Sequence, residues 1–331
     1  MAQRSLATAL LCALALGFGL PAGSQPALRT ITLGVTSRTA NDWTTFIADK
    51  YGFFAANGLK PDVVVVGVNS GVAQQLTGGA FDLGEVTTTQ MVLAVQGGAP
   101  LVSGENSGSG VPYSLIAKKG LTSTAQLKGK LISIGGPSDI TRPFMDTIME
   151  RSGFKPDDWT YTFAGSSADR YAALVAGAID ATLLAPPMSF KAIAQGFPVL
   201  DEVPKYFPNF PYVTWAVRPA WAKDHAEVVV SFIKAELQAA RWLNDPANRQ
   251  KAIALLMDQT NSSVDDATKS YGVFVTEEHY FSTTGTFTPD SFSRVLQTMI
   301  KAGMLQPPAP AATKFYDNGY AERANVQLRG K

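Results

Sequence analysis

Residues Ala172–Leu200 read AALVAGAIDATLLAPPMSFKAIAQGFPVL, and this stretch decides the fold because the chain carries it twice. Moved back by 98 positions, it aligns without a gap on residues Leu76–Leu101. The identical pairs include Leu174 and Leu76, Gly177 and Gly79, Asp180 and Asp82, Gly196 and Gly98, and Pro198 and Pro100. A gapless match of this length indicates that one structural unit occurs twice along the chain.

Each copy predicts the same order of elements. A helix ends at a glycine, a short apolar strand follows an aspartate, a Thr or Pro loop leads into a second helix, and a strand begins at a proline. This αβαβ unit is too long for a solenoid repeat, so its duplication predicts two similar lobes. Each lobe of this α/β protein is expected to hold a mainly parallel sheet with helices on both faces, and the two lobes to enclose a cleft.

The first 24 residues have the features of a signal peptide. Arg4 precedes an uncharged apolar run, Leu6–Leu20, and small residues follow at Ala22 and Ser24, where signal peptidase requires them. The run of about 15 residues is shorter than the roughly 20 that a membrane span needs. The sequence therefore predicts residues 1–24 as a cleavable signal and secretion of the chain, with the mature protein beginning near Gln25.

Cysteine content and charge exclude several classes of site. Cys12 is the only cysteine, and the residue before it is Leu11, where a lipoprotein signal needs a small side chain. The mature chain would have no cysteine, which excludes disulfides, a thiol nucleophile and thiolate metal sites. Without the signal, basic and acidic residues are equal in number, so nucleic acid is not an expected partner.

The order of predicted elements divides the mature chain into segments. Residues 25–113 are expected to form the N-terminal part of lobe 1, 114–212 lobe 2, 213–305 the C-terminal part of lobe 1, and 306–331 a C-terminal tail. The extended runs Pro112–Lys119 and Tyr212–Arg218 are the expected crossings between the lobes. An unbroken valine run within Asp62–Val66 predicts a strand that is buried on both faces.

By their order and spacing, several short segments resemble the substrate-binding proteins of ATP-driven importers, in the nitrate, sulfonate, taurine and thiamine-precursor group (SsuA/THI5-like, NMT1). The resemblance covers nearly the whole mature chain. It rests on Ile47–Phe54 (IADKYGFF), Gly58-Leu59, Leu127–Lys130 (LKGK), Ala173-Leu174 with Gly177 and Asp180-Ala181, Pro186-Pro187, and more weakly on Phe232–Pro246 and Phe315–Asn318.

This resemblance implies a type II periplasmic binding fold in which two crossing strands act as a hinge. It also implies a monomeric receptor without a cofactor, which closes its lobes over a small solute. The receptor then delivers the solute to the permease and ATPase subunits of an ABC importer. A periplasmic subunit that senses a ligand through a membrane receptor would use the same binding physics, so that alternative stays open.

The candidate ligand-binding residues come from loops of both lobes, because open parallel sheets bind ligands beyond the carboxyl ends of their strands. Backbone N–H groups and the helix dipole favour an anion there, and hydroxyl groups add donors. A nitrate, a sulfonate, taurine or an aromatic carboxylate fits, whereas helix capping is the structural alternative for each residue. The candidates are Ser37, Thr39, Asn41, Trp43, Asn69, Ser70, Gly71, Glu85, Thr87, Thr88, Ser107, Ser138, Thr141, Arg142, Ser166, Pro187, Tyr212 and Trp215.

Three arginines could pair with an anionic solute. Arg142 is the best single candidate, because it begins a second-lobe helix beside two hydroxyl residues and can form a bidentate contact. Its alternative is a solvated charge near Asp139. Arg38 and Arg170 are weaker candidates, because each has an aspartate close in the sequence that could neutralise it.

Glu85 points to a different ligand chemistry. A carboxylate directly after a cleft-facing strand could hold an amine or a ring nitrogen, as a zwitterion or a thiamine-precursor pyrimidine would require. Trp43, Tyr113, Tyr212 and Trp215 could stack on a ring, although aromatic side chains more often pack in a core or hinge.

Little in the sequence supports an enzyme. The two histidines, His225 and His279, have no metal-ligand spacing and lie outside the expected cleft loops. The glycine-rich loops lack the Gly-Lys-Ser/Thr ending of a phosphate loop, and no Gly-x-Ser-x-Gly elbow occurs. Pyrimidine-synthesising relatives of the same fold need a Cys-rich segment and an active-site histidine, which this chain lacks. The sequence therefore predicts a binding protein rather than an enzyme, with no metal site.

Overall fold

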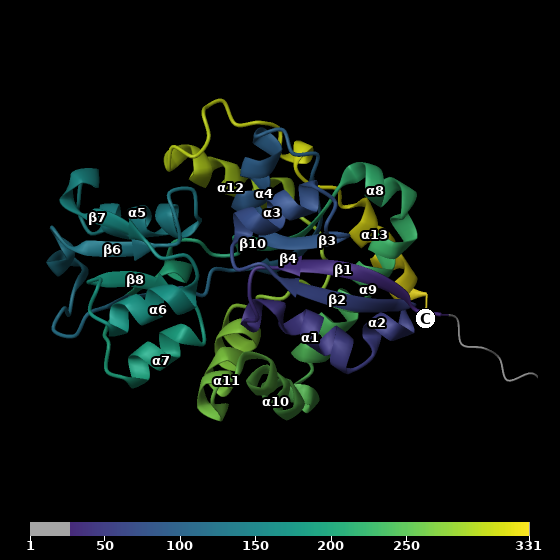
Figure 1. Ribbon diagram of the computed structural model, residues 1–331, viewed down its shortest axis with the longest axis horizontal. Coiled ribbons are helices and arrows are strands. Elements are labelled where there is room, and N and C mark those ends of the chain that lie inside the picture. Colours follow the sequence, from purple (N-terminus) through teal and green to yellow (C-terminus); the bar gives the residue numbers. More distant parts are fainter. Residues whose placement is uncertain (1–26, 331) are drawn as a thin grey trace, which may run out of the picture.

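The computed structural model describes residues 27–330, so the predicted signal peptide and Cys12 lie outside the described residues. Two five-stranded sheets form the centres of two lobes that lie side by side (Figure 1). The two-lobed α/β architecture predicted from the repeat is therefore confirmed. Within the described residues, no helix is long and apolar enough to span a membrane.

The sheet of lobe 1 has the strand order β2-β1-β3-β10-β4. Its strands are β1 (Arg29–Val35), β2 (Leu59–Val65), β3 (Leu83–Thr87), β4 (Val102–Ser109) and β10 (Pro211–Val217). The sheet of lobe 2 has the strand order β7-β6-β8-β5-β9. Its strands are β5 (Ser114–Ala117), β6 (Leu131–Ile134), β7 (Thr160–Phe163), β8 (Ala181–Leu184) and β9 (Val199–Glu202).

The two sheets have the same topology, strand for strand. In each, three neighbouring strands are parallel, and one inverted strand, β10 or β5, pairs antiparallel on both sides. The repeated aspartates accept equivalent hydrogen bonds in the two lobes. Asp82 accepts the backbone N–H of Thr32 at 2.9 Å, and Asp180 accepts that of Leu131 at 3.0 Å. The duplication seen in the sequence is thus a duplication of hydrogen bonding as well.

Helices cover both faces of each sheet. In lobe 1 they are α1 (Trp43–Lys50), α2 (Phe53–Ala56), α3 (Asn69–Thr77), α4 (Thr88–Gln96), α8 (Pro219–Asp224), α9 (Ala226–Asn244), α10 (Arg249–Thr260), α11 (Val264–Tyr271), α12 (Pro289–Lys301) and α13 (Gly319–Arg329). In lobe 2 they are α5 (Thr141–Arg151), α6 (Ser167–Val175) and α7 (Met188–Ala194). Helices α1, α2 and α9 pack on one side of the first sheet, and α3, α4 and α12 lie on the other (Figure 1).

Short helical turns connect these elements. They are η1 (Ala40–Asp42), η2 (Thr124–Leu127), η3 (Pro156–Asp158), η4 (Val203–Lys205), η5 (Pro246–Asn248), the π-helical turn η6 (Gly272–Glu277) and η7 (Ala312–Lys314). Beyond η7, Tyr316 forms a β-bridge with Ser103, and α13 packs against α9. The C-terminal segment therefore lies on lobe 1.

The chain crosses between the lobes through residues 110–113 and 203–210. Strand β10 was expected to be the return crossing, but it belongs wholly to the first sheet, where it pairs with β3 and β4. The valine run is a second correction. Its strand, β2, is an edge strand on which Val64 and Val65 are 37% and 50% exposed, so the prediction of burial on both faces is wrong.

Candidate functional site

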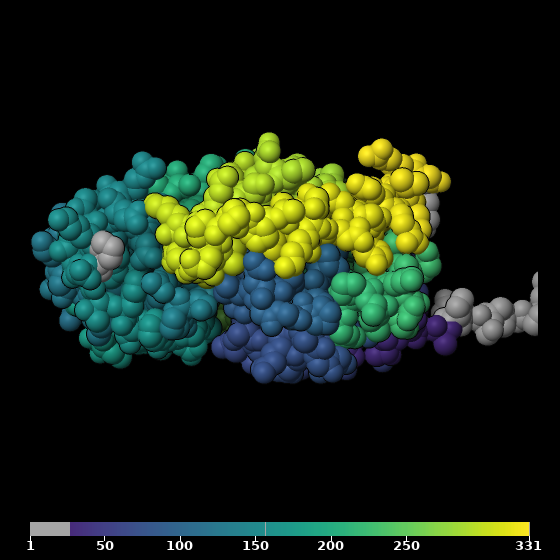
Figure 2. Space-filling view, turned by 90° about the horizontal axis from the view of Figure 1, so that it is seen from above, coloured from purple at the N-terminus to yellow at the C-terminus, as the bar shows by residue number. Residues whose placement is uncertain are grey.

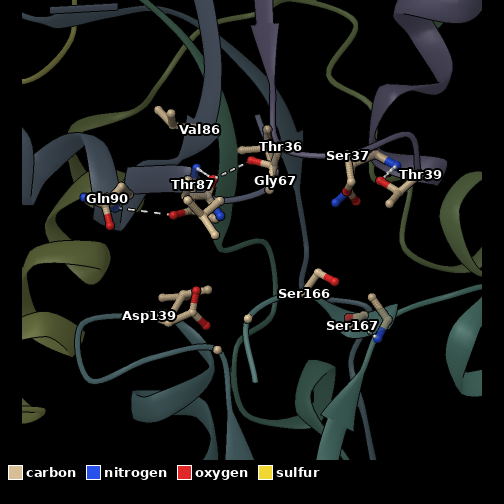
Figure 3. Close-up of a pocket in the computed structure, with 18 of the residues that line it drawn as sticks. Thr36, Ser37, Thr39, Gly67, Val86, Thr87, Gln90, Asp139, Ser166 and Ser167 are labelled. Carbon is tan, nitrogen blue, oxygen red and sulfur yellow. Dashed lines mark hydrogen bonds between the residues drawn. The ribbon is translucent and has the colours of Figure 1, made fainter. Parts of the chain in front are cut away.

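A cavity of about 680 Å³ lies between the lobes, at the carboxyl ends of their strands. Figure 3 shows Thr36, Thr39 and Thr87 of lobe 1 facing Asp139 and Ser166 of lobe 2 across this space. Such a volume is in the range of pockets that hold small organic molecules. The cavity is therefore the candidate ligand site.

Most of the predicted loop residues line this cavity. From lobe 1 and lobe 2 they are Ser37, Thr39, Asn41, Asn69, Ser70, Glu85, Thr87, Ser138, Ser166, Pro187 and Tyr212. They come together because equivalent turns of the duplicated unit face each other. In lobe 1, the Asn69 side chain accepts the Thr87 N–H at 3.0 Å; 98 positions later, Ser167 accepts the Ala185 N–H at 3.3 Å.

The two predicted tryptophans lie in the core of lobe 1 rather than in the cavity lining. Trp43 is fully buried, donates its indole N–H to the Ala252 carbonyl at 3.1 Å and packs edge-on against Tyr271. Trp215 is 1% exposed and packs against Phe232 of α9. Both side chains contribute to packing, which is the alternative that applies to most buried aromatic residues.

Five further predicted residues do not line the cavity, and most of these have a structural role. Gly71 and Thr88 lie in the first turns of α3 and α4. Ser107 donates its hydroxyl to the Val213 carbonyl at 3.2 Å. Thr141 bonds to Asp139 and accepts the Gly135 N–H, so it shapes the loop that carries Asp139. The fifth residue is Arg142.

Arg142 points away from the cavity lining. Its guanidinium donates to the Pro137 carbonyl at 3.2 Å and lies 3.8 Å from the Asp146 carboxylate, while the side chain is 41% exposed. Arg170 lines the cavity instead and is only 2% exposed. Asp169, which was expected to neutralise it, bonds to Ser166 at the start of α6. Among residues 27–330, no carboxylate forms an ion pair with Arg170.

Arg170 is held in place by neutral acceptors of its own lobe. Its Nε donates to the Leu183 carbonyl at 3.2 Å, and its terminal nitrogens donate to the Gly165 carbonyl and the Ser167 hydroxyl. Arginine stays charged in proteins, so a buried guanidinium with neutral partners leaves a net positive charge at the cavity wall. This wall can attract a solute anion.

The opposite wall carries buried carboxyl groups, and its one lining arginine among the described residues, Arg38, is exposed and donates to Gln259. Glu85 and Asp42 line the cavity at 7% and 3% exposure, and burial raises the pKa of both. The Asp42 carboxylate lies close enough to Glu85 to raise the Glu85 pKa well above its ordinary value. One Asp42 oxygen, Oδ2, accepts the Thr39 N–H at 2.9 Å. The other oxygen, Oδ1, accepts no hydrogen bond from a described N–H or hydroxyl group, so the Glu85 carboxyl is its available partner. Burial and mutual repulsion disfavour ionisation of both carboxyl groups at once and so favour one proton shared between them.

Two more buried acids lie behind this pair. Burial raises the pKa of Glu236 on α9 to about 7 and that of Glu105 on β4 well above its ordinary value. Glu85 and Glu105 flank Trp215 in register, so all three side chains lie on the sheet face that α9 covers. With Asp266 of α11, the described part of lobe 1 holds five buried acidic residues, of which only Glu85 and Asp42 line the cavity.

Tyrosines form the floor of the cavity between the two walls. Tyr113 lies in the first crossing and Tyr212 lies on β10. Their hydroxyl groups are 2.8 Å apart and form a hydrogen bond. Tyr113 also contacts Arg170, whose charge lowers the Tyr113 pKa against the larger effect of burial. Tyr212 packs against Tyr280, and the charge of Glu85 contributes to the raised pKa of Tyr280. The basic and acidic walls are thus separated by tyrosine side chains.

Comparison with known families supports these observations. The model of the NMT1/THI5-like family matches residues 40–248, which include loops on both walls of the cavity. The chain belongs to the NMT1/THI5-like family. No curated protein matches its sequence.

Solved structures share the fold of this NMT1/THI5-like chain at low sequence identity. The alkanesulfonate-binding protein SsuA from Xanthomonas axonopodis pv. citri bound to MOPS is 16% identical, with 89% of this chain and 100% of that chain covered and a TM-score of 0.71. The periplasmic nitrate-binding protein NrtA from Synechocystis PCC 6803 is 14% identical (92% and 90% covered, TM-score 0.77). The ligand-binding component of an ABC-type import system from Staphylococcus aureus is 15% identical (89% and 99% covered, TM-score 0.77). The two-lobed fold is thus common to binding proteins of this kind.

Sequence reasoning missed or undervalued the charged residues of the NMT1/THI5-like site. Asp42 was considered only as a possible helix cap and as the aspartate that could neutralise Arg38, and Arg170 was discounted because of Asp169. A signal for Arg170 was present, because it lies four residues before Leu174 and so shares the buried face of α6. No group of His, Cys, Asp or Glu with the arrangement of a metal site occurs among residues 27–330.

Proposed function

We propose that this NMT1/THI5-like chain is the solute-binding component of an ABC importer. It takes up a small organic anion or zwitterion between its lobes and delivers it to the permease and ATPase subunits. The observation that carries the proposal is the interlobe cavity, whose lining includes the buried, ion-pair-free Arg170. A guanidinium in this setting gives charge-assisted hydrogen bonds to a sulfonate or carboxylate.

The predicted anion donors surround the same wall. Ser166 begins α6 and Ser138 lies in the loop before α5, so hydroxyl groups and helix N-termini face the space beside Arg170. Two structural relatives are named for anionic solutes, an alkanesulfonate and nitrate, which supports the same class for this chain.

Binding is proposed to act through lobe closure. Residues 114–202 would rotate against the rest of the chain about the crossings at 110–113 and 203–210. A solute that contacts both walls stabilises only the closed arrangement, so it shifts the population towards that form. Outside the cavity, Lys301 of α12 and Glu150 of α5 form an ion pair of 2.6 Å between the lobes. Figure 2 shows the yellow segment that contains α12 against the teal second lobe.

Export to the periplasm, through the predicted signal peptide, belongs to the same proposal. The enzymatic alternative is disfavoured by the histidines. His225 stacks on Trp221 at 4.7 Å, His279 lies on an exposed turn, and neither lines the cavity. A second candidate solute, a thiamine-precursor pyrimidine, is favoured by one observation, namely that Glu85 could accept N–H groups of the ring.

Two measurements test this function. A thermal-shift screen should include nitrate, alkane- and arylsulfonates, taurine, aromatic carboxylates and pyrimidine precursors, because a ligand at 100 times its Kd stabilises the fold by about 2.7 kcal/mol. Small-angle scattering should then show a smaller radius of gyration with the stabilising solute than without it. Stabilisation without compaction, or turnover of the solute by the purified chain, would refute the receptor function.

A permease assay separates transport from sensing. If a permease and an ATPase are encoded beside this chain, the loaded protein should stimulate ATP hydrolysis by that pair, reconstituted in vesicles, more than the unloaded protein does. A neighbouring histidine kinase that responds to the loaded protein would instead favour the sensing alternative.

A further inference from the structure

Each copy of the duplicated unit carries one buried charged residue at a position where the other copy has an apolar residue. The 98-residue shift pairs Val72 of α3 with Arg170 of α6, and Glu85 of β3 with Leu183 of β8. All four residues are at most 7% exposed. Lobe 2 therefore has a base where lobe 1 has an apolar residue, and lobe 1 has an acid where lobe 2 has an apolar residue. Neither charge is needed to build the unit, because the other copy forms without it.

Both charges face the same cavity but do not neutralise each other. Within the described chain, Arg170 and Glu85 form no ion pair with any residue. Tyr113, which contacts Arg170, and Tyr212 line the cavity between them, and Tyr280 packs against Tyr212 behind the lining, near Glu85. Burying two opposite charges costs desolvation energy, and no direct ion pair between them offsets this cost. A solute that contacts both charges would offset it.

The acidic wall has an unfilled hydrogen-bonding capacity. Asp42 Oδ1 accepts no hydrogen bond from any described donor other than the Glu85 carboxyl. Asp42 is also only 3% exposed, so water cannot readily satisfy this oxygen. The groups that face Glu85 from neighbouring elements are Asp42, Glu236, Glu105 and Tyr280, all of them acidic or neutral. A cationic nitrogen is the ligand group that such a wall would bind best.

The geometry points to a dipolar solute: its anionic group lies against Arg170 in lobe 2 and its protonated nitrogen against Asp42 and Glu85 in lobe 1. This inference rests on the proposed receptor function and narrows its solute class. Because the solute nitrogen would replace the proton that the two carboxyl groups share, binding of a zwitterion releases a proton to solvent. A plain anion has no group for the acidic wall and releases none.

Two matched probe series test the charge requirement. One has a short body, with taurine, ethanesulfonate and ethylamine; the other has an aromatic body, with para-(aminomethyl)benzenesulfonate, para-toluenesulfonate and para-methylbenzylamine. Calorimetry with the mature chain should rank the zwitterion above the plain anion by at least about tenfold in affinity in one series, the effect of one charge-assisted contact. Repeating the titration at about pH 7 in buffers of different ionisation enthalpy should show proton release for that zwitterion only.

The variant Glu85→Gln tests the residue that carries the inference. The zwitterion should lose its advantage over the anion and its proton release, while the affinity for the anion stays equal or rises. Glu322→Gln is the matched control, because Glu322 is an exposed acid on α13, away from the cavity. Thermal melts of both variants show whether each is folded, and Asp42→Asn provides a second removal of charge from the same wall.

The outcomes separate the inference from the proposed function. If anions bind and compact the chain but zwitterions gain nothing, the dipolar solute is wrong and the receptor function stands. If the zwitterion is preferred equally by wild type and Glu85→Gln, the assignment of its nitrogen to this wall is wrong. If none of the six probes binds, both the dipolar class and the anionic or zwitterionic solute class fall.

Discussion

The two lobes of this protein share one scaffold and differ in the chemistry of one cavity wall. Both sheets have the same topology, and Asp82 and Asp180 accept equivalent backbone hydrogen bonds from the matching strands β1 and β6. The charged residues of the cavity lining differ between the copies, however: Glu85 of lobe 1 corresponds to Leu183 of lobe 2, and Arg170 of lobe 2 corresponds to Val72 of lobe 1. Residues that the copies share therefore build the unit, and residues in which they differ give the cavity its polarity.

The same contrast explains how much the sequence could reveal. A repeat detects shared residues, so the fold, the two lobes and the loops that face the cleft were all predicted from it. The polar lining was also accessible, because strand ends and helix starts can be located from glycines, aspartates and capping residues. What the repeat cannot detect is a position at which the copies differ, and the charged walls consist of such positions.

Side-chain direction accounts for the other errors. Arg142 and Arg170 both lie near the start of a helix beside an aspartate, so sequence distance ranks them equally. The structure separates them by helix face, since Arg142 lies on an exposed face and Arg170 on a buried one. Position along the strand separates two residues of β10: Tyr212, near its start, lines the cavity, whereas Trp215, three residues further on, packs against Phe232 in the core.

The largest effect is expected from Arg170→Met, which gives lobe 2 an apolar residue at this position, as lobe 1 has in Val72. The affinity for para-toluenesulfonate should fall roughly 100-fold, because charge-assisted hydrogen bonds to the anion are lost. Calorimetry measures the loss, and Arg170→Lys should retain part of the affinity because it keeps the charge. An unchanged affinity in Arg170→Met would show that the anion lies elsewhere.

The buried acids should make lobe 1 the pH-sensitive lobe. Burial raises the pKa of Glu236 from 4.5 to about 7, so the folded chain holds a proton there that the unfolded chain has released. The free energy of unfolding should therefore fall as pH rises from about 4.5 to about 7, by on the order of 3 kcal/mol for this group, and level off above it. Glu85 and Glu105 act in the same direction.

Urea denaturation between about pH 5 and about pH 8 measures this slope. Glu236→Gln removes one titrating group, so its stability should depend less on pH and should equal or exceed that of wild type at about pH 8. Glu322→Gln, an exposed acid on α13, should leave the slope unchanged. A wild-type stability that rises with pH across this range would contradict the buried, protonated state of Glu236.

A smaller effect tests the equivalence of the scaffold. Asp82→Ala and Asp180→Ala each remove one acceptor from a backbone N–H, at 2.9 Å and 3.0 Å respectively. Each should cost about 1 to 2 kcal/mol of unfolding free energy, with the two values close to each other. Because the sites lie in different lobes, the double variant should show the sum of the two costs. If the two variants lose clearly different amounts of unfolding free energy, the two copies share this hydrogen bond but not its contribution to stability.

The smallest effect is expected from Arg142→Ala, the arginine that sequence reasoning favoured. Its guanidinium lies on the outer side of the loop, bonded to the Pro137 carbonyl, and its side chain is 41% exposed. Its long-range attraction for an anion is screened by water and salt, so the affinity for para-toluenesulfonate should change by less than about twofold at physiological ionic strength. Calorimetry beside Arg170→Met gives the comparison directly. A loss of affinity as large as that of Arg170→Met would place the anion at the start of α5. The polarity of the cavity would then come from loop residues rather than from the positions at which the two copies differ.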